Sequence, residues 1–227
     1  MGKTKTNEYI FPIFLALLND DNHDIRLALF KNLCALNEVI KIDSCIQTIF
    51  PSLMDIINNK SWRIRIQLVE IVEIMVKTLS SSLFIEKIFP LCISCLTDSV
   101  YAIREAGCKI LASIYKTYKS DNFEKKILDK LNEMKVNSNY LIRNTIISLI
   151  KNLANEKKSH EFVEKKLLGY LYKLSKDKIS NIRMNSGAAL VVCIHIVNSN
   201  EVANEINSYI EDLKKDSDID VVNAVSH

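Results

Sequence analysis

Apolar residues recur at helical spacing in short stretches, and a polar turn leads from each stretch to a second amphipathic one. The clearest pair covers residues 50–57 and 62–75, with a polar Asn-Asn-Lys-Ser sequence between them. Its two apolar faces consist of Leu53, Met54, Ile56 and Ile57, and of Ile64, Leu68, Val72 and Met75. Spacing of three and four residues is typical of amphipathic helices. The pattern therefore predicts pairs of helices joined by tight turns.

A short polar motif marks the turn of each predicted pair. Asp or Asn stands six residues before an Arg, and Ile directly precedes that Arg. The copies are Asp20 with Arg26, Asn59 with Arg65, Asp98 with Arg104, Asn137 with Arg143, and Asp177 with Arg183. Successive arginines are 39, 39, 39 and 40 residues apart, and a further copy at Asp216 lacks the Arg. A period near 40 indicates a solenoid of stacked helix pairs.

The period predicts an all-α solenoid over residues 1–227, built from about six antiparallel helix pairs. The expected repeats are 8–43, 44–83, 84–122, 123–161, 162–200 and 201–227. The last repeat is short and neither end has a polar cap, so we expect a fragment of a longer array. Pro12, Pro51 and Pro90 precede their arginines by 14 residues. We expect them to open the first helices, where a missing N–H costs nothing.

The repeated Asp or Asn and the repeated Arg have different predicted roles. A short acceptor side chain in a turn caps backbone N–H groups. Arg in the first turn of a helix is poorly placed for the helix dipole, so its repetition needs another cause. We predict a ladder in which each Arg bonds the Asp or Asn of a neighbouring repeat. Such a pair is worth about 1 kcal/mol or less if it is exposed to solvent.

The order Pro, then Asp after eight residues, then Arg after fourteen is the HEAT-repeat pattern. Beyond that pattern, the chain resembles the C-terminal repeats of the regulatory scaffold protein (A-type) of type 2A protein phosphatase. The resemblance rests on residues 37–40 (Asn-Glu-Val-Ile), 61–65 (Ser-Trp-Arg-Ile-Arg), 100–106, 139–143, 181–185 and 216–221. It implies a non-catalytic scaffold that docks the catalytic phosphatase subunit. Regulatory B-type subunits would sit mainly on repeats that are absent here.

The resemblance also implies where the catalytic subunit docks, namely on the ridge formed by the turns within the repeats. The residues implied are Trp62, Arg63, Val100, Tyr101, Asn139, Tyr140, Ser180 and Asn181. Trp62, Tyr101 and Tyr140 share one position, three residues before the Arg, where the first and fifth repeats have His23 and Ser180. Aromatic residues beside Arg are typical of interface hot spots. The alternative is that each ring merely covers its own turn.

Charge and composition narrow the range of partners. The net charge of +3 is too small to indicate nucleic acid or an anionic membrane. Lysines gather in the fourth and fifth predicted repeats, but interleaved acidic residues favour a solvated helix face. No apolar run is long enough to span a bilayer, and no signal peptide is evident. We expect a cytoplasmic protein, with a nuclear location also compatible.

No motif for catalysis or cofactor binding is recognisable, so the sequence predicts a non-enzyme without metal or cofactor. The pair Cys92-x-x-Cys95 lies in an apolar helix without a second pair, which favours a core role over zinc. His195, within an apolar stretch, is interpreted as a packed core histidine. Two other functions remain open: a karyopherin-like transport receptor, and a nucleic-acid-binding solenoid that uses the lysines of repeats four and five.

Overall fold

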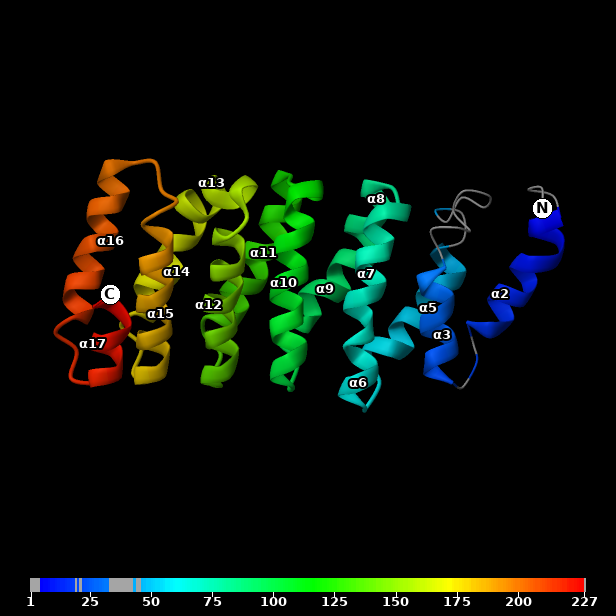
Figure 1. The fold of residues 1–227 in the computed structure, drawn as a ribbon, viewed down its shortest axis with the longest axis horizontal. Helices are drawn as coiled ribbons and strands as arrows, with labels where there is room; N and C mark the ends of the chain where they lie inside the picture. The colour runs from blue at the N-terminus through cyan, green and yellow to red at the C-terminus, as the bar shows by residue number, and fades with distance from the viewer. Residues whose placement is uncertain (1–4, 19, 21, 33–42, 44–45, 227) are drawn as a thin grey trace. The chain divides into compact units, whose positions relative to one another are not determined.

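A computed structural model describes residues 5–18, 20, 22–32, 43 and 46–226. Every regular element in these ranges is helical. Two compact units divide the chain, residues 1–110 and residues 111–227. Figure 1 labels the helices of both units. Each unit is therefore considered by itself.

The first unit contains short helices and half of one long helix. Its elements are η1 (Thr6–Ile10), α2 (Phe11–Leu17), α3 (His23–Lys31), α5 (Ile46–Ile57), α6 (Trp62–Arg65), α7 (Gln67–Thr78), α8 (Ser81–Leu83), η3 (Phe84–Ile88), α9 (Phe89–Cys95) and the start of α10 (Tyr101–Tyr118). Helix α5 packs against α6 and α7, and α3 packs against α7. Of the predicted apolar faces, Leu53, Ile56, Leu68, Val72 and Met75 are buried. They form the core on which the turns are mounted.

The second unit holds the end of α10 and three further helix pairs. Its other elements are α11 (Asp121–Met134), α12 (Tyr140–Ala154), η4 (Lys157–Ser159), α13 (His160–Phe162), η5 (Val163–Leu167), α14 (Leu168–Leu174), α15 (Ser180–Cys193), α16 (Asn200–Leu213) and α17 (Ile219–Val225). Helix α15 packs between α12 and α17, so the second helices of consecutive pairs lie side by side (Figure 1). Tyr115 is fully buried, and its ring stacks on Phe162 with 5.5 Å between the ring centres.

Two of the three prolines stand in a first turn as expected: Pro12 in α2 and Pro90 in α9, each directly after a π-helical turn. Pro51 instead lies inside α5. In the π-helical turns Phe11 N–H donates to Thr6 O and Phe89 N–H donates to Phe84 O. Proline lacks an N–H and its ring conflicts with the carbonyl four residues before it, and a wider π-turn relieves that conflict. A third π-turn precedes Leu168 and Gly169, so proline is not its only cause.

Close helix packing explains the glycine within α15. A Cβ atom at Gly187 would lie 2.6 Å from Val225 Cγ1 and 3.0 Å from Leu213 Cδ1. Both distances are shorter than ordinary van der Waals contact between carbon atoms. Glycine weakens a helix interior, so its presence here reflects the approach of α16 and α17 to α15.

Replacing this glycine should weaken the second unit. We expect Gly187→Val to lower the free energy of unfolding by about 2 kcal/mol, because the added methyl groups overpack the contact with Val225. Gly169→Val is the matched control, since nothing lies within 4 Å of a Cβ atom at Gly169. Urea denaturation of both variants measures the difference. Equal stability of the two variants would contradict the close packing around Gly187.

Candidate functional site

The turn between the two helices of each pair is closed by the repeated Asp or Asn. In each turn the side-chain Oδ1 accepts a hydrogen bond from the N–H two residues later, over 2.8 to 3.0 Å. The acceptors are Asp20, Asn59, Asp98, Asn137, Asp177 and Asp216. This is the local Asx-turn geometry that Asp and Asn favour. It orients the first residue of every second helix in the same way.

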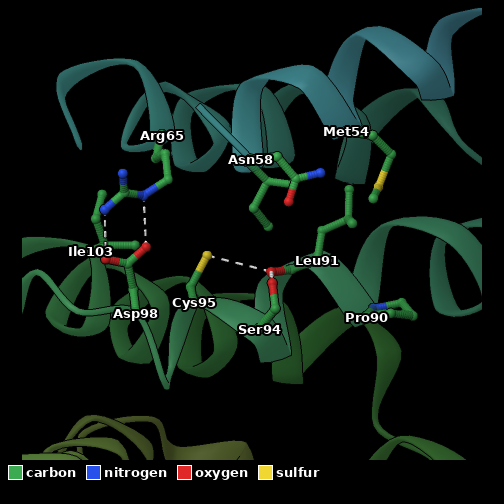
Figure 2. A pocket seen from close by; sticks show the side chains of 10 residues that line it. Met54, Asn58, Arg65, Pro90, Leu91, Ser94, Cys95, Asp98 and Ile103 are labelled. Carbon is green, nitrogen blue, oxygen red and sulfur yellow. Dashed lines mark hydrogen bonds and ion pairs between the residues drawn. The ribbon is translucent and has the colours of Figure 1, made fainter. Parts of the chain in front are cut away.

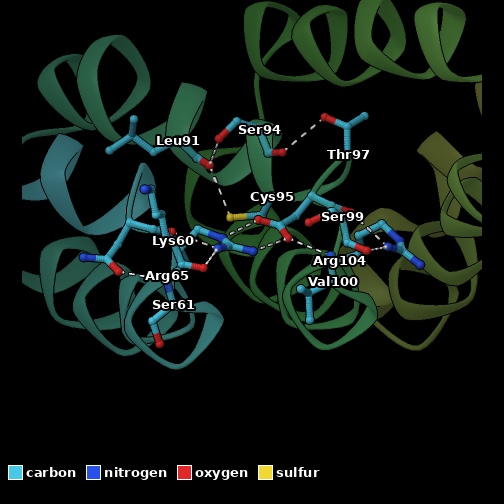
Figure 3. Close-up of polar contacts among 12 residues, drawn as sticks. Lys60, Ser61, Arg65, Leu91, Ser94, Cys95, Thr97, Ser99, Val100 and Arg104 are labelled. Atoms are coloured by element: carbon cyan, nitrogen blue, oxygen red, sulfur yellow. Dashed lines mark hydrogen bonds and ion pairs between the residues drawn. The ribbon is translucent and has the colours of Figure 1, made fainter.

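The repeated Arg first binds its own turn. Arg65 Nη1 donates to Asn59 O at 2.8 Å and to Lys60 O at 3.1 Å. Arg104 and Arg143 make the same pair of contacts with the carbonyl oxygens six and five residues before them. Arg183 donates to Asp177 O at 3.0 Å. Figure 3 shows these contacts for Arg65 and Arg104. The Arg therefore satisfies turn carbonyls, a role that the motif alone did not reveal.

The same arginines also reach the next turn along the chain. Arg65 Nε and Nη2 donate to the two carboxylate oxygens of Asp98, both at 2.8 Å. Equivalent bidentate pairs join Arg143 to Asp177 and Arg183 to Asp216, at distances of 2.7 to 3.0 Å. In the last pair, Asp216 of the sixth motif accepts both hydrogen bonds from Arg183. The sixth motif needs only its Asp for this contact, which explains why the Asp is kept although the Arg is missing. The predicted rungs from Arg26 and Arg104 stay predictions.

The three ion pairs are largely buried, so the condition of solvent exposure attached to the sequence-based energy is not met. Side-chain exposure is only 9–17% across the three pairs, so the small energy of an exposed pair does not apply. Removing one partner of a buried pair costs about 3–5 kcal/mol, because the other charge stays buried and unpaired. Burial raises the pKa of Asp177, but hydrogen bonds from Arg143 and from the Ile179 N–H outweigh it, and the pKa is lowered.

In the first unit, the ladder sets two aromatic side chains on neighbouring turns. Trp62 begins α6 and Tyr101 begins α10, and the bond between Arg65 and Asp98 ties the two turns together. Trp62 is 36% exposed and Tyr101 is 61% exposed. The Arg63 guanidinium carbon lies 4.8 Å from the centre of the Trp62 ring, within cation–π range. Val100 beside them is half-buried.

In the second unit, the corresponding turns carry Tyr140, Ser180 and a residue that the sequence reading missed. Tyr140 is 38% exposed at the start of α12, while Ser180 is half-buried at the start of α15. Ile219 begins α17 and is 67% exposed. It stands three residues after Asp216, the same offset at which Trp62 follows Asn59. That offset would have identified Ile219 had the missing Arg not removed the sixth motif from the comparison.

The two remaining predicted docking residues have local partners. Asn139 accepts a hydrogen bond from Leu141 N–H at 3.0 Å and so caps α12. Asn181 is exposed, and its Oδ1 accepts from Asn185 Nδ2 at 3.2 Å. Asn185 Nδ2 also donates to Asn144 Oδ1 on α12 at 2.9 Å. Of these contacts, the bond between Asn185 and Asn144 links the second helices α15 and α12.

A hollow of about 320 Å³ lies beside the first-unit ladder. Figure 2 shows Arg65 and Asp98 at one end of it and Met54 and Pro90 at the other. Cys95 on its wall donates to Leu91 O, and burial raises the pKa of this thiol to about 12. A thiol that stays protonated at neutral pH is a poor nucleophile. The hollow thus offers shape and apolar surface rather than reactive groups.

A family model described as "Sister chromatid cohesion protein PDS5 protein" matches residues 7–217. The chain belongs to the PDS5 family. No curated protein matches it.

Solved structures similar to this PDS5-family chain are helical repeat proteins. The MAST/Orbit N-terminal domain superposes with a TM-score of 0.57 at 13% identity, over 89% of this chain and 97% of that one. A designed armadillo repeat protein in complex with the peptide (KR)4 gives 0.49 at 15% identity, over 94% and 95%. The predicted fold class, an all-α solenoid of HEAT repeats, is confirmed. The comparisons do not support the phosphatase scaffold specifically.

The structure also bears on the expectations for individual histidines and cysteines of this PDS5-family chain. His195 is exposed at the end of its helix pair, so the prediction of a core histidine was wrong. The helix α15 ends at Cys193, before that residue. Cys92 is a buried free thiol. The side chain of His23, residues 37–40, Cys34 and Cys45 lie outside the described part of the chain.

Among the residues that the structure describes, no group of three or more His, Cys, Asp or Glu side chains is placed to hold a metal ion. Within the same residues, no helix combines the length and apolar character needed to cross a bilayer.

The buried ion pair between Arg143 and Asp177 predicts a loss of stability when the Asp177 charge is removed. Asp177→Asn keeps the turn acceptor, which Asn supplies at Asn59 and Asn137, but it removes the charge that faces Arg143. We expect a loss of about 3 kcal/mol of unfolding free energy at neutral pH, at the lower end of the range for a broken buried pair, because the guanidinium loses its counter-charge while Asn keeps an acceptor. The control Asp212→Asn changes an exposed carboxylate and should have little effect.

The pH dependence follows from the lowered pKa of Asp177. Its contribution is present above the ordinary value of 3.8 and is lost as the pH falls through the lower native-state pKa. Urea titrations between about pH 5 and pH 2 should therefore give a shallower acid loss in Asp177→Asn than in the unchanged chain. Identical slopes in the two proteins would contradict a charge-stabilised rung.

Proposed function

We propose that this chain is a non-catalytic interaction module that binds a protein partner through the exposed turns of each unit, here together called the ridge. The ridge consists of Trp62, Arg63, Val100 and Tyr101 in the first unit, and of Asn139, Tyr140, Ser180, Asn181 and Ile219 in the second. One observation carries the proposal: large apolar side chains are exposed at a single repeated position that a buried ladder holds in place.

Exposure and rigidity together support binding over the alternative that each ring covers its own turn. Tyr101 and Ile219 have more than half of their surface in contact with solvent, so they cover little of their own turns. The Asx-turns and bidentate pairs fix the backbone from which these side chains project. A partner then meets pre-ordered aromatic groups, which lowers the entropy cost of binding.

Family membership favours a partner among the proteins that act in sister chromatid cohesion. We infer a scaffolding role, in which the stacked turns position such a partner without chemistry of their own. A cytoplasmic or nuclear location is compatible with this role. The raised thiol pKa of Cys95 and the engagement of its Sγ by Leu91 O also favour a non-catalytic role.

The catalytic subunit of type 2A phosphatase is the second candidate partner. It is favoured by the turn sequences around Trp62, Tyr101 and Tyr140, which the resemblance assigned to phosphatase docking. Both candidates would use the same ridge, so the ridge and the partner are tested separately.

The ridge is tested by removing one exposed ring. We expect Tyr101→Ala to weaken partner binding about thirtyfold, which corresponds to about 2 kcal/mol for a hot-spot aromatic. Tyr9→Ala is the matched control, because Tyr9 is 55% exposed but lies on η1 rather than on a turn. Biolayer interferometry against purified proteins of the cohesion machinery measures both affinities. Equal losses in the two variants, with the fold intact, would refute the ridge.

The partner is tested with the same immobilised chain and the catalytic subunit of type 2A phosphatase. Saturable binding that Trp62→Ala and Tyr101→Ala abolish would favour the phosphatase candidate. Binding of a cohesion protein with the same sensitivity would favour the family-based candidate. If neither class binds the folded chain, the proposed partners are wrong.

The second-unit ridge generates a separate prediction. Ile219→Asp places a charge at an exposed position, so stability should stay within about 0.5 kcal/mol of the unchanged chain. Partner affinity should fall about tenfold if Ile219 contacts the partner. Thermal unfolding and interferometry on the same sample separate the two effects. Unchanged affinity would remove Ile219 from the ridge.

A further inference from the structure

A small lysine-lined hollow lies in the second unit, on different elements from the ridge. It encloses about 180 Å³ and is lined by Lys135, Lys166, Gly169, Tyr170, Lys173 and Leu174. Lys166 and Lys173 are exposed and seven residues apart on η5 and α14, with Gly169 and Tyr170 between them. Residues spaced by three, four and seven share one helix face, so the two ammonium groups flank the glycine and the phenol.

The floor of the hollow is ordered by a small polar network. Asn132 Oδ1 accepts from Lys135 Nζ at 2.6 Å and from the Tyr170 hydroxyl at 3.0 Å. The Lys135 ammonium also lies 5.7 Å from the centre of the Tyr170 ring. Leu174 is buried beneath. One cation is therefore fixed against an aromatic wall, next to apolar surface.

The other two cations are not neutralised within the protein. Lys166 and Lys173 make no hydrogen bond or ion pair with any residue that the structure describes. Nearby acidic side chains are engaged elsewhere, since Glu133 pairs with Lys130 and Glu161 pairs with Lys165 and Lys119. The pKa of Tyr170 is raised mainly by burial and to a smaller extent by the negative charge of Asp129. The charges of Lys166 and Lys173 are thus not paired with a carboxylate among the described residues.

Gly169 keeps the hollow open. The first three repeats have Pro at the corresponding position and the fourth has Asp129, whereas nothing lies within 4 Å of a Cβ atom built at Gly169. Packing therefore does not require glycine here, and any side chain would occupy the space between Lys166 and Lys173. The open space at Gly169 is therefore part of the hollow that the lysines line.

We propose that this hollow binds a phosphorylated serine or threonine side chain in a segment of a protein partner. A phosphate carries close to two negative charges and three acceptor oxygens near neutral pH, and lysine binds phosphate as a point charge. The Tyr170 ring and Leu174 offer contact for the carbon atoms next to the phosphate. This goes beyond the ridge, because it uses first helices and does not depend on Trp62 or Tyr101.

A single phosphate suits the surroundings better than a long polyanion. Glu133, Glu161 and Glu164 stand among the lysines of the same helices, so a nucleic-acid backbone extending past the hollow would meet repulsive charges. The net charge of the whole chain is only +3. A short segment with one phosphate avoids the flanking carboxylates.

The test is a titration of the full ¹⁵N-labelled chain with N-acetyl-O-phosphoserine amide, followed by amide shifts. We expect saturable shifts centred on Lys135, Lys166, Gly169, Tyr170 and Lys173, and none with N-acetylserine amide. Lys166→Glu with Lys173→Glu should weaken binding by about tenfold or more. The control pair Lys125→Glu with Lys157→Glu reverses the same charge at sites elsewhere in the unit and should bind normally.

Three outcomes of the variant and competition experiments would overturn the proposal. Equal weakening by both charge-reversal pairs would mean general charge attraction. Undiminished binding by Gly169→Leu, which fills the hollow without altering charge, would place the ligand elsewhere. Tighter binding of inorganic phosphate or of a short DNA duplex than of a phosphoserine peptide, at the same amides, would mean that a protein segment is not the ligand. Absence of any saturable shift would also refute it.

Discussion

The buried, bidentate bond between the Arg of one turn and the Asp of the next is the interaction on which the stack depends. Apolar faces alone leave helix pairs free to slide and rotate against one another, because the hydrophobic effect is non-directional. A guanidinium that donates to two carboxylate oxygens accepts only one relative placement. Since the same Arg also holds the carbonyls of its own turn, a single side chain fixes both the turn and its neighbour. The exposed ridge inherits its order from this bond.

Much of this arrangement was predictable from the sequence, because the ladder residues recur at a fixed period. The turn acceptors and the second-helix starts followed from the spacing of Asp98 and Arg104 and their equivalents. The π-turns could not be predicted from the prolines, because a π-turn also precedes Leu168 and Gly169, where no proline is present. The exposed position of Ile219 was not predicted, because the sixth motif lacks the Arg by which the other turns were aligned. The exposure of His195 was not predicted, because the apolar stretch around it does not reveal that the helix ends at Cys193.

The same physics explains why the resemblance suggested a different family from the one that matches. The turn strings that carried it contain the residues that build any HEAT-type stack: the Asn139 cap, the Ile before each Arg, and the Arg itself. Asn139 caps α12 and Arg143 pairs with Asp177, so both have structural work that is independent of a partner. Strings that serve the scaffold cannot distinguish families that share it. Only the exposed side chains between them can carry partner identity.

The ladder also gives the stack a direction and a unit of length. In the second unit the bonds run one way: Arg143 donates forward to Asp177, and Arg183 donates forward to Asp216. Loss of one whole period would bring an Arg against the Asp or Asn of another turn, so it would again meet an acceptor. Loss of any other length would leave a buried guanidinium facing the wrong residue. Insertions and deletions in such a chain are therefore quantised, and its length can drift during evolution only in steps of a complete repeat.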